Sequence, residues 1–289
     1  MNQALKRRII NGLELLPYGH DLYLQLARKR LGITYRGIYD SFEQAQGAAE
    51  SRLPNRYDVI NENKGEHLDQ ELSIVDKRVL DIDYPLLFWL SRLMEPNQKV
   101  WELGGSLGQS FYSFERYFPY PDNIEWVIAE LPGAVQAGRR IAARRGEHRL
   151  KFRESGDTSA APRSDLFLTA GTLQYMEIDV GDVLEGLEGL PTHVLIHNLP
   201  VHNTDEFWTL QYLDVCEVPY HISSRTSLVE NLTRLGYELV DQWKNPRQIE
   251  IPYRPEKKVD GYCGFYFRNT HGEGQNGNAR ILDARKKRA

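Results

Sequence analysis

A glycine-rich segment in the middle of the chain has the residue types and spacing of a ligand-binding turn. It reads Val100-Trp101-Glu102-Leu103-Gly104-Gly105-Ser106-Leu107-Gly108-Gln109-Ser110, an apolar strand pattern that runs into a helix pattern. Gly104 can adopt the positive φ of a tight turn, and without side chains at Gly105 and Gly108 a ligand and the helix can approach the backbone closely. The segment is typical of a turn that holds a nucleotide-like ligand, although such junctions also occur as purely structural turns.

An acidic residue, Glu130, ends the next predicted strand 26 residues after Gly104. In open α/β folds an acidic side chain at about this distance accepts hydrogen bonds from ribose hydroxyls. A carboxylate has enough lone pairs to accept from both hydroxyls of a vicinal diol. A glutamate at a strand end is common by itself, but the strand, the spacing and the acid together indicate a nucleoside site.

The composition of the 289 residues limits the classes of protein to consider. With 41% apolar and 26% charged residues the chain can bury a sizeable core. The longest apolar run, residues 86–90, is far shorter than the roughly 18 residues of a membrane helix, so we expect no integral membrane segment. Two cysteines and no signal-peptide pattern favour a cytoplasmic protein. A net charge of −4 supplies no global field for phosphates, so nucleic acid is not an expected partner.

Short β-rich runs alternate with helix patterns from residue 97 to residue 269, as in a parallel sheet covered by helices. We predict strands over 99–103, 126–130, 150–153, 166–169, 194–197, 238–241 and 262–267, and helices over 109–117, 132–145, 180–190 and 227–235. No helix pattern separates the last two strands, which should form an antiparallel hairpin. The predicted fold class is α/β, with a Rossmann-like, mostly parallel seven-stranded sheet, helices on both faces and a C-terminal antiparallel hairpin.

The regions on either side of this domain differ from it. Residues 1–96 are polar, contain helix patterns over 42–51 and 86–94, and are predicted to form a helical N-terminal cap or lid. Residues 270–289 are rich in glycine, asparagine and glutamine and contain four consecutive basic residues at 285–288, so we predict a flexible basic tail.

The glycine segment resembles the first motif of the class I S-adenosylmethionine-dependent methyltransferases, an acid followed by spaced glycines. A dinucleotide fingerprint, G-x-G-x-x-G, would need glycine where Ser106 stands, so a dehydrogenase is disfavoured. Glu130-Leu131-Pro132 looks like the acid-Leu-Pro element of O-methyltransferases. Gly156-Asp157, followed by Asp165-Leu166-Phe167-Leu168, looks like their adenine-binding loop and fourth strand.

This resemblance implies S-adenosyl-L-methionine as the cofactor and a set of residues that bind it. Glu130 would bind the ribose hydroxyls and Asp157 the adenine amino group, while Glu102 would face the ammonium group of the methionine part. The other residues expected beside the cofactor are Gly104, Gly105, Ser106, Gly108, Leu131, Ala170 and Gly171.

An aromatic box, residues 35–42, narrows the resemblance further. Together with Tyr84-Pro85 it is similar to a small group of uncharacterised bacterial methyltransferase-like proteins, whose genes tend to lie among those for surface polysaccharides. The resemblance implies a sugar-containing or other small acceptor, with Tyr39 in its binding site. An aromatic anchor that docks the cap on the sheet is at least as good an interpretation of the box.

Residues that face the acceptor should follow the strands that end near Thr169 and His197, because ligands bind beyond the carboxyl ends of parallel strands. His197 and His202 are the candidate bases, and a histidine with its ordinary pKa near 6.5 is an effective base around neutrality. Either histidine can equally be a hydrogen-bonded structural residue. Tyr175 and Asn198 are the further candidates for contact with the acceptor. No metal site is expected, because no third ligand accompanies His193 and His197.

The hypothesis is a methyltransferase that O-methylates a small or sugar-containing acceptor. One departure from the O-methyltransferase pattern favours an alternative, because residues 173–176 hold no histidine where that family carries its catalytic one. The alternative is a catalytically inactive, methyltransferase-like binding or scaffold protein. The oligomeric state cannot be read from the sequence.

Overall fold

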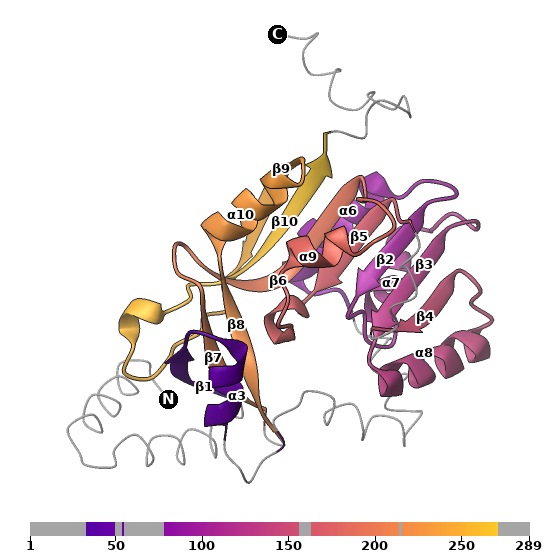
Figure 1. Ribbon diagram of the computed structural model, residues 1–289. Coiled ribbons are helices and arrows are strands. Elements are labelled where there is room, and N and C mark those ends of the chain that lie inside the picture. Colours follow the sequence, from indigo (N-terminus) through magenta and orange to yellow (C-terminus); the bar gives the residue numbers. More distant parts are fainter. Residues whose placement is uncertain (1–32, 50–53, 55–77, 156–162, 214–215, 271–289) are drawn as a thin grey trace, which may run out of the picture.

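A computed structural model describes residues 33–49, 54, 78–155, 163–213 and 216–270 of the 289. Its centre is a seven-stranded sheet in the spatial order β4-β3-β2-β5-β6-β10-β9 (Figure 1). All neighbouring strands from β4 to β6 run parallel, and β10 is antiparallel to both β6 and β9. The strands are β2 (Lys99–Leu103), β3 (Glu125–Glu130), β4 (Leu150–Glu154), β5 (Leu166–Ala170), β6 (His193–His202), β9 (Tyr237–Asn245) and β10 (Tyr262–Asn269). The predicted fold class is confirmed.

Helices cover both faces of this sheet, because successive side chains of a strand point to opposite faces. Val100 and Trp126 face one apolar cluster, under α6 (Tyr84–Leu93), α7 (Gln109–Glu115) and α8 (Pro132–Arg145). Their neighbours Trp101 and Val127 face the other cluster, under α9 (Val180–Glu185) and α10 (Arg225–Arg234). Pro132 starts α8, where its missing N–H costs nothing, and Gly146 ends it in the left-handed conformation.

A second, antiparallel sheet is the feature that the sequence patterns did not predict. It consists of β1 (Ile33–Tyr39), β7 (Phe207–Leu213) and β8 (Glu217–Ser224), with β7 in the middle. The end of β6 pairs with the end of β8 in parallel, Val201 opposite Ser223, and this pairing joins the two sheets (Figure 1).

The described part of the N-terminal region is therefore mixed. The helix expected over 42–51 is present as α3 (Phe42–Ala48), whose N-cap Ser41 accepts a hydrogen bond from the backbone of Gln44. The preceding residues form β1 instead of helix, because they pair with a strand about 170 residues further along the chain. The rest of the predicted cap, residues 1–32, 50–53 and 55–77, and the predicted tail from residue 271 lie outside the described residues.

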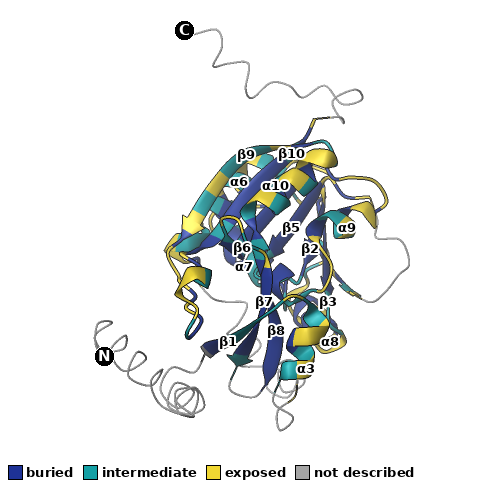
Figure 2. Ribbon diagram, turned by 60° about the vertical axis from the view of Figure 1, so that its left-hand side comes forward, coloured by how far each residue is buried: buried dark blue, intermediate teal, exposed yellow. Residues whose placement is uncertain are grey.

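The buried residues concentrate in the strands of both sheets, while the helices present exposed outer faces (Figure 2). Among the described residues, no helix has the length and apolar character needed to cross a bilayer.

Candidate functional site

The centre of the main sheet contains a topological switch point. From β2 the chain crosses to β3 on one side, and it later returns to β5 on the other side of β2. In open α/β sheets the crevice at the carboxyl ends of two such strands is where ligands bind. Three candidate elements meet at this edge: the glycine turn after β2, Glu130 at the end of β3, and the loop that begins with Gly171 after β5.

The glycine turn adopts the backbone conformations that its glycines allow. Gly104 has φ +73° and Gly108, the N-cap of α7, has φ +93°, which are values that residues with a Cβ rarely adopt. Ser106 lies between them with φ 54° and is one of the few described non-glycine residues with a positive φ. A Cβ added to Gly104 would overlap Thr172, so this glycine also permits the close approach of the β5 loop.

Glu130 contacts the glycine turn directly. Its Oε1 accepts a hydrogen bond from the backbone N–H of Ser106 at 3.0 Å, and its Oε2 accepts from the backbone N–H of Leu131 at 2.7 Å. A carboxylate has about four lone-pair sites, so two remain after these bonds. Glu130 is only partly buried, and the remaining sites can accept from a ligand.

Glu102 lies beneath the turn and is fully buried. Its Oε2 accepts a hydrogen bond from the indole of Trp126 at 2.8 Å, and in the described part of the chain its Oε1 has no hydrogen-bond partner. Burial raises the pKa of Glu102 to about 7, against the lowering effect of the polar side chains of Ser110 and Trp126. A Cβ on Gly105 would come within 2.6 Å of this carboxyl carbon, so Gly105 is needed to accommodate Glu102.

The loop after β5 and the end of β6 form the next part of the site. Gly171 follows Ala170 with φ +73°, and its carbonyl accepts a hydrogen bond from Gln174 Nε2 at 2.8 Å. Asn198 was expected in a loop but lies inside β6, at a bulge where the pairing with β10 skips a residue. With φ 57° it turns the chain from the main sheet towards β8, and its Oδ1 accepts from Asn245. Bulges of this kind often lie beside active sites.

Neither candidate base keeps a free nitrogen lone pair. The indole N–H of Trp243 can only donate, so Nδ1 of buried His197 accepts that bond and its Nε2 carries the proton towards Asp83, 3.1 Å away. Nδ1 of His202 likewise accepts the backbone N–H of Asp205 at 3.0 Å. These hydrogen bonds hold both imidazole rings in place and occupy the lone pair that a base would need.

The remaining sequence candidates are placed apart from one another. Tyr175 Oη donates to Gln211 at 2.8 Å and so joins a buried network of hydroxyl groups that includes Tyr35. Tyr39 packs into the apolar cluster around Trp208, next to α3. Asp157 lies outside the described residues.

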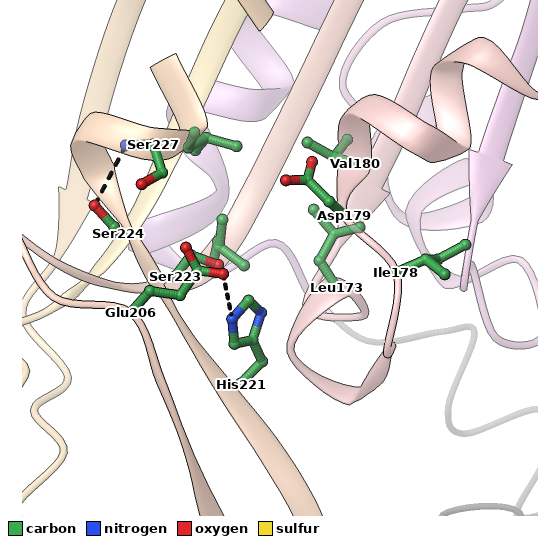
Figure 3. A pocket seen from close by; sticks show the side chains of 11 residues that line it. Leu173, Ile178, Asp179, Val180, Glu206, His221, Ser223, Ser224 and Ser227 are labelled. Atoms are coloured by element: carbon green, nitrogen blue, oxygen red, sulfur yellow. Dashed lines mark hydrogen bonds and ion pairs between the residues drawn. The ribbon is translucent and has the colours of Figure 1, made fainter. Parts of the chain in front are cut away.

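A cleft opens on the α9 and α10 side of this edge, between the loop after β5 and strand β8 (Figure 3). The N-termini of both helices border it. Asp179 caps α9 through the N–H of Gly181, and Ser224 caps α10 through the N–H of Ser227. The lining residues are Leu173, Ile178, Asp179, Val180, Leu199, Glu206, His221, Ser223, Ser224, Ser227 and Leu228.

His221 and Glu206 are the residues of this cleft that the sequence analysis missed. His221 Nε2 lies 3.0 Å from Glu206 Oε1, and the imidazole stacks on Trp208 with ring centroids 4.5 Å apart. The hydrogen bond from His221 lowers the pKa of Glu206, so this carboxyl stays ionised. The alternation of Val218, Tyr220 and Ile222 in the sequence is the signal that could have placed His221 on a strand.

A metal centre has no support in the described part of the chain, where no group of three or more His, Cys, Asp or Glu side chains is arranged to hold an ion. The polar groups of the site are instead carboxylates, backbone N–H groups, hydroxyls and the imidazole of His221.

Comparisons with known proteins find similarity in structure but not in sequence. No family model matches this chain, and no curated protein matches its sequence. The glycopeptide N-methyltransferase MtfA in complex with S-adenosyl-L-methionine is 15% identical, with 65% of this chain and 94% of that chain covered and a TM-score of 0.45. The CcbJ methyltransferase from Streptomyces caelestis is 14% identical, with 68% of this chain and 95% of that chain covered and a TM-score of 0.44.

The YcgJ protein from Bacillus subtilis is 11% identical, with 64% of this chain and 98% of that chain covered and a TM-score of 0.44. Similarity at this level concerns the fold alone and does not identify an activity.

Proposed function

We propose that this protein binds S-adenosyl-L-methionine at the carboxyl ends of β2, β3 and β5 and transfers its methyl group to a small acceptor. One observation carries the proposal: the carboxylate of Glu130 meets the backbone of Ser106 at the topological switch point, with the remaining lone pairs of the carboxylate available.

The residues present suit this cofactor. The free lone pairs of Glu130 can accept from the two ribose hydroxyls, and the glycine turn allows the ligand close to the backbone. The unpaired Oε1 of Glu102 lies under the same turn, where a cationic ammonium group nearby, directly or through water, would compensate its burial. Bound at this edge, the cofactor would supply a sulfonium-activated methyl group, which leaves the protein to align the acceptor and remove its proton.

The acceptor that we propose is a small or sugar-containing molecule methylated on oxygen. The support for it is the resemblance of the aromatic box around Tyr35, together with a cleft beside the β5 loop whose lining combines apolar side chains with three serines. The acceptor would enter this cleft as a small molecule or as the end of a chain.

Isothermal titration with S-adenosyl-L-methionine and with its demethylated product tests the binding site. Glu130→Ala should weaken binding by roughly 1–3 kcal/mol, because hydrogen bonds to a charged acceptor are lost. Glu154→Ala is the matched control, since Glu154 is the exposed register partner of Glu130 on β4. No heat of binding from folded protein, or equal effects of the two substitutions, would contradict the proposal.

A catalytically inactive scaffold is the second candidate. It is favoured by the hydrogen bonds that occupy both His197 and His202, and by the lack of a histidine in the loop after β5. Transfer of a labelled methyl group to small molecules of a cell extract separates the two, because a scaffold would bind the donor and label nothing.

A further inference from the structure

We propose that His221, oriented by Glu206, is the base of this protein, and that the cleft beside it binds a polyhydroxylated acceptor that is neutral or carries an amine. This inference rests on the proposed methyl transfer and deepens it, because it names the residue that takes the proton and the chemistry of the acceptor.

His221 differs from His197 and His202 because its hydrogen bonds leave one ring nitrogen with a free lone pair. Glu206 is ionised and can only accept, so Nε2 of His221 must carry the proton of the 3.0 Å bond. The lone pair then lies on Nδ1, which has no hydrogen-bond partner among the residues that the structure describes. A carboxylate that fixes the tautomer and orientation of an imidazole in this way is how enzymes position a histidine base.

The free nitrogen faces the correct side of the cleft. Figure 3 shows the imidazole between Glu206 and Leu173, with the nitrogen that is not bonded to Glu206 turned towards Leu173. Leu173 follows Thr172, whose hydroxyl donates to the carbonyl of Gly104 at 3.3 Å. Two consecutive residues thus span the distance from the glycine turn to the cleft, so a methyl donor held at the turn would lie next to it.

The charges of the lining determine which acceptors fit. Three serine hydroxyls and two carboxylates, Asp179 and Glu206, face the cleft, and none of the eleven lining residues is lysine or arginine. Asp179 Oδ2 also accepts from Asn231 at 2.6 Å, which holds this carboxylate at the rim. Hydroxyls and carboxylates pair with the hydroxyls and ammonium group of an amino sugar, whereas an anionic ligand would meet like charge.

The transfer step needs the methyl donor, the acceptor hydroxyl and His221, and no further reactant. The acceptor hydroxyl gives its proton to Nδ1 of His221 while its oxygen forms a bond to the methyl carbon. The bond between that carbon and the sulfur breaks, and its electron pair stays on the sulfur. The products are a methyl ether, S-adenosylhomocysteine and protonated His221, which returns its proton to water.

Binding is tested by saturation-transfer NMR with three sugars of equal size, namely glucosamine, glucose and glucuronate. Glucosamine and glucose should show transfer, with glucosamine at least fivefold tighter than glucuronate. Ile178→Arg adds a cation at the exposed rim and should weaken glucosamine binding at least fivefold. Leu190→Arg is the matched control, because Leu190 is similarly exposed but lies outside the cleft, and its effect should stay within twofold. Transfer to none of the sugars, a preference for glucuronate, or equal effects of the two arginines would overturn the cleft assignment.

The base is tested by transfer of a labelled methyl group from S-adenosyl-L-methionine to the sugar that binds best, between pH 6 and 9. His221→Gln should lose transfer by about a hundredfold or more while sugar binding changes less than threefold. Glu206→Gln keeps the fold because its side chain is half exposed. With glucose, which has no ammonium group for the carboxylate to pair with, it should lower kcat and shift the pH profile with little change in KM. His148→Gln, at an exposed histidine away from the cleft, should change nothing.

The outcomes also separate this inference from the proposed function. If S-adenosylhomocysteine does not bind, the proposed function fails and the base assignment fails with it. If it binds and a sugar binds, but His221→Gln transfers as fast as His148→Gln, then only the base assignment is overturned. If the wild-type protein binds both and transfers no methyl group, the base assignment fails and the inactive scaffold replaces the proposed transfer, while the donor site stands.

Discussion

Arg36 on β1 forms a two-point ion pair with Glu217 on β8, across the intervening strand β7. Arg36 Nε lies 2.6 Å from Glu217 Oε1, and a terminal guanidinium nitrogen lies 2.5 Å from Oε2. The glutamate is 1% exposed, and the same terminal nitrogen also donates to the carbonyl of Ala48 at the end of α3. This pair ties the N-terminal segment to the strand that carries His221.

Removal of one partner of this pair should therefore destabilise the protein strongly. Arg36→Leu takes the guanidinium away from a buried carboxylate, and the free energy of unfolding should fall by roughly 3–5 kcal/mol in a urea titration. The double variant Arg36→Leu with Glu217→Leu removes both charges and should recover most of the loss. A single variant as stable as the wild type would show that the pair is not closed in solution.

Glu102 should make the stability of the protein depend on pH. Its pKa of about 7 in the folded protein exceeds the ordinary 4.5, so the unfolded chain loses this proton first as the pH rises. The contribution of Glu102 to the stability of the folded protein is fully present below pH 4.5 and is lost as the pH rises through 7. Glu102→Gln cannot ionise, and at pH 8 it should be more stable than the wild type by on the order of 2–3 kcal/mol, with little difference at pH 4. Glu154→Gln, at an exposed strand end, should leave the pH profile unchanged.

His193 should show the opposite dependence. Burial lowers its pKa from 6.5 to about 4, so the unfolded chain takes up this proton first as the pH falls. Its contribution to stability is present above pH 6.5 and is lost as the pH falls towards 4. NMR of the histidine ring should show no protonation of His193 at pH 6, while exposed His148 serves as an internal reference. A midpoint near 6.5 for His193 would contradict its burial against Tyr266.

Gly104→Ala should damage both stability and donor binding. The substitution combines a strained φ of +73° with overlap against Thr172, and we expect a loss of at least about 2 kcal/mol. Gly146→Ala is the matched control, because Gly146 has φ +65° but no heavy atom within 4 Å of an added Cβ. It should lose only about 1 kcal/mol, and Gly104→Ala combined with Thr172→Gly should approach that value. Equal losses for the two alanine variants would show that the β5 loop does not rest on the turn.

The sequence was sufficient to predict the main sheet, because its strands and helices follow local patterns. The predicted bounds of β2 and α8 agree with the structure, and the remaining core strands differ by a few residues at their ends. The positive φ of Gly104 and the place of Glu130 at a strand end were also predictable, because they depend on properties of single residues; their role in binding stays a prediction.

Only the tertiary structure decided which histidines keep a free lone pair and where the second sheet lies. His197 accepts a hydrogen bond from the indole of Trp243, and His202 accepts one from the backbone N–H of Asp205. No spacing in the sequence predicts these contacts. β1 pairs with β7 over a separation of about 170 residues, and nothing in the local pattern of either segment says which strand it meets. The partnership of His221 with Glu206 follows from the pairing of β7 with β8, and the cleft lies where β8 meets the end of β6. Both depend on which strands meet rather than on the patterns within each strand.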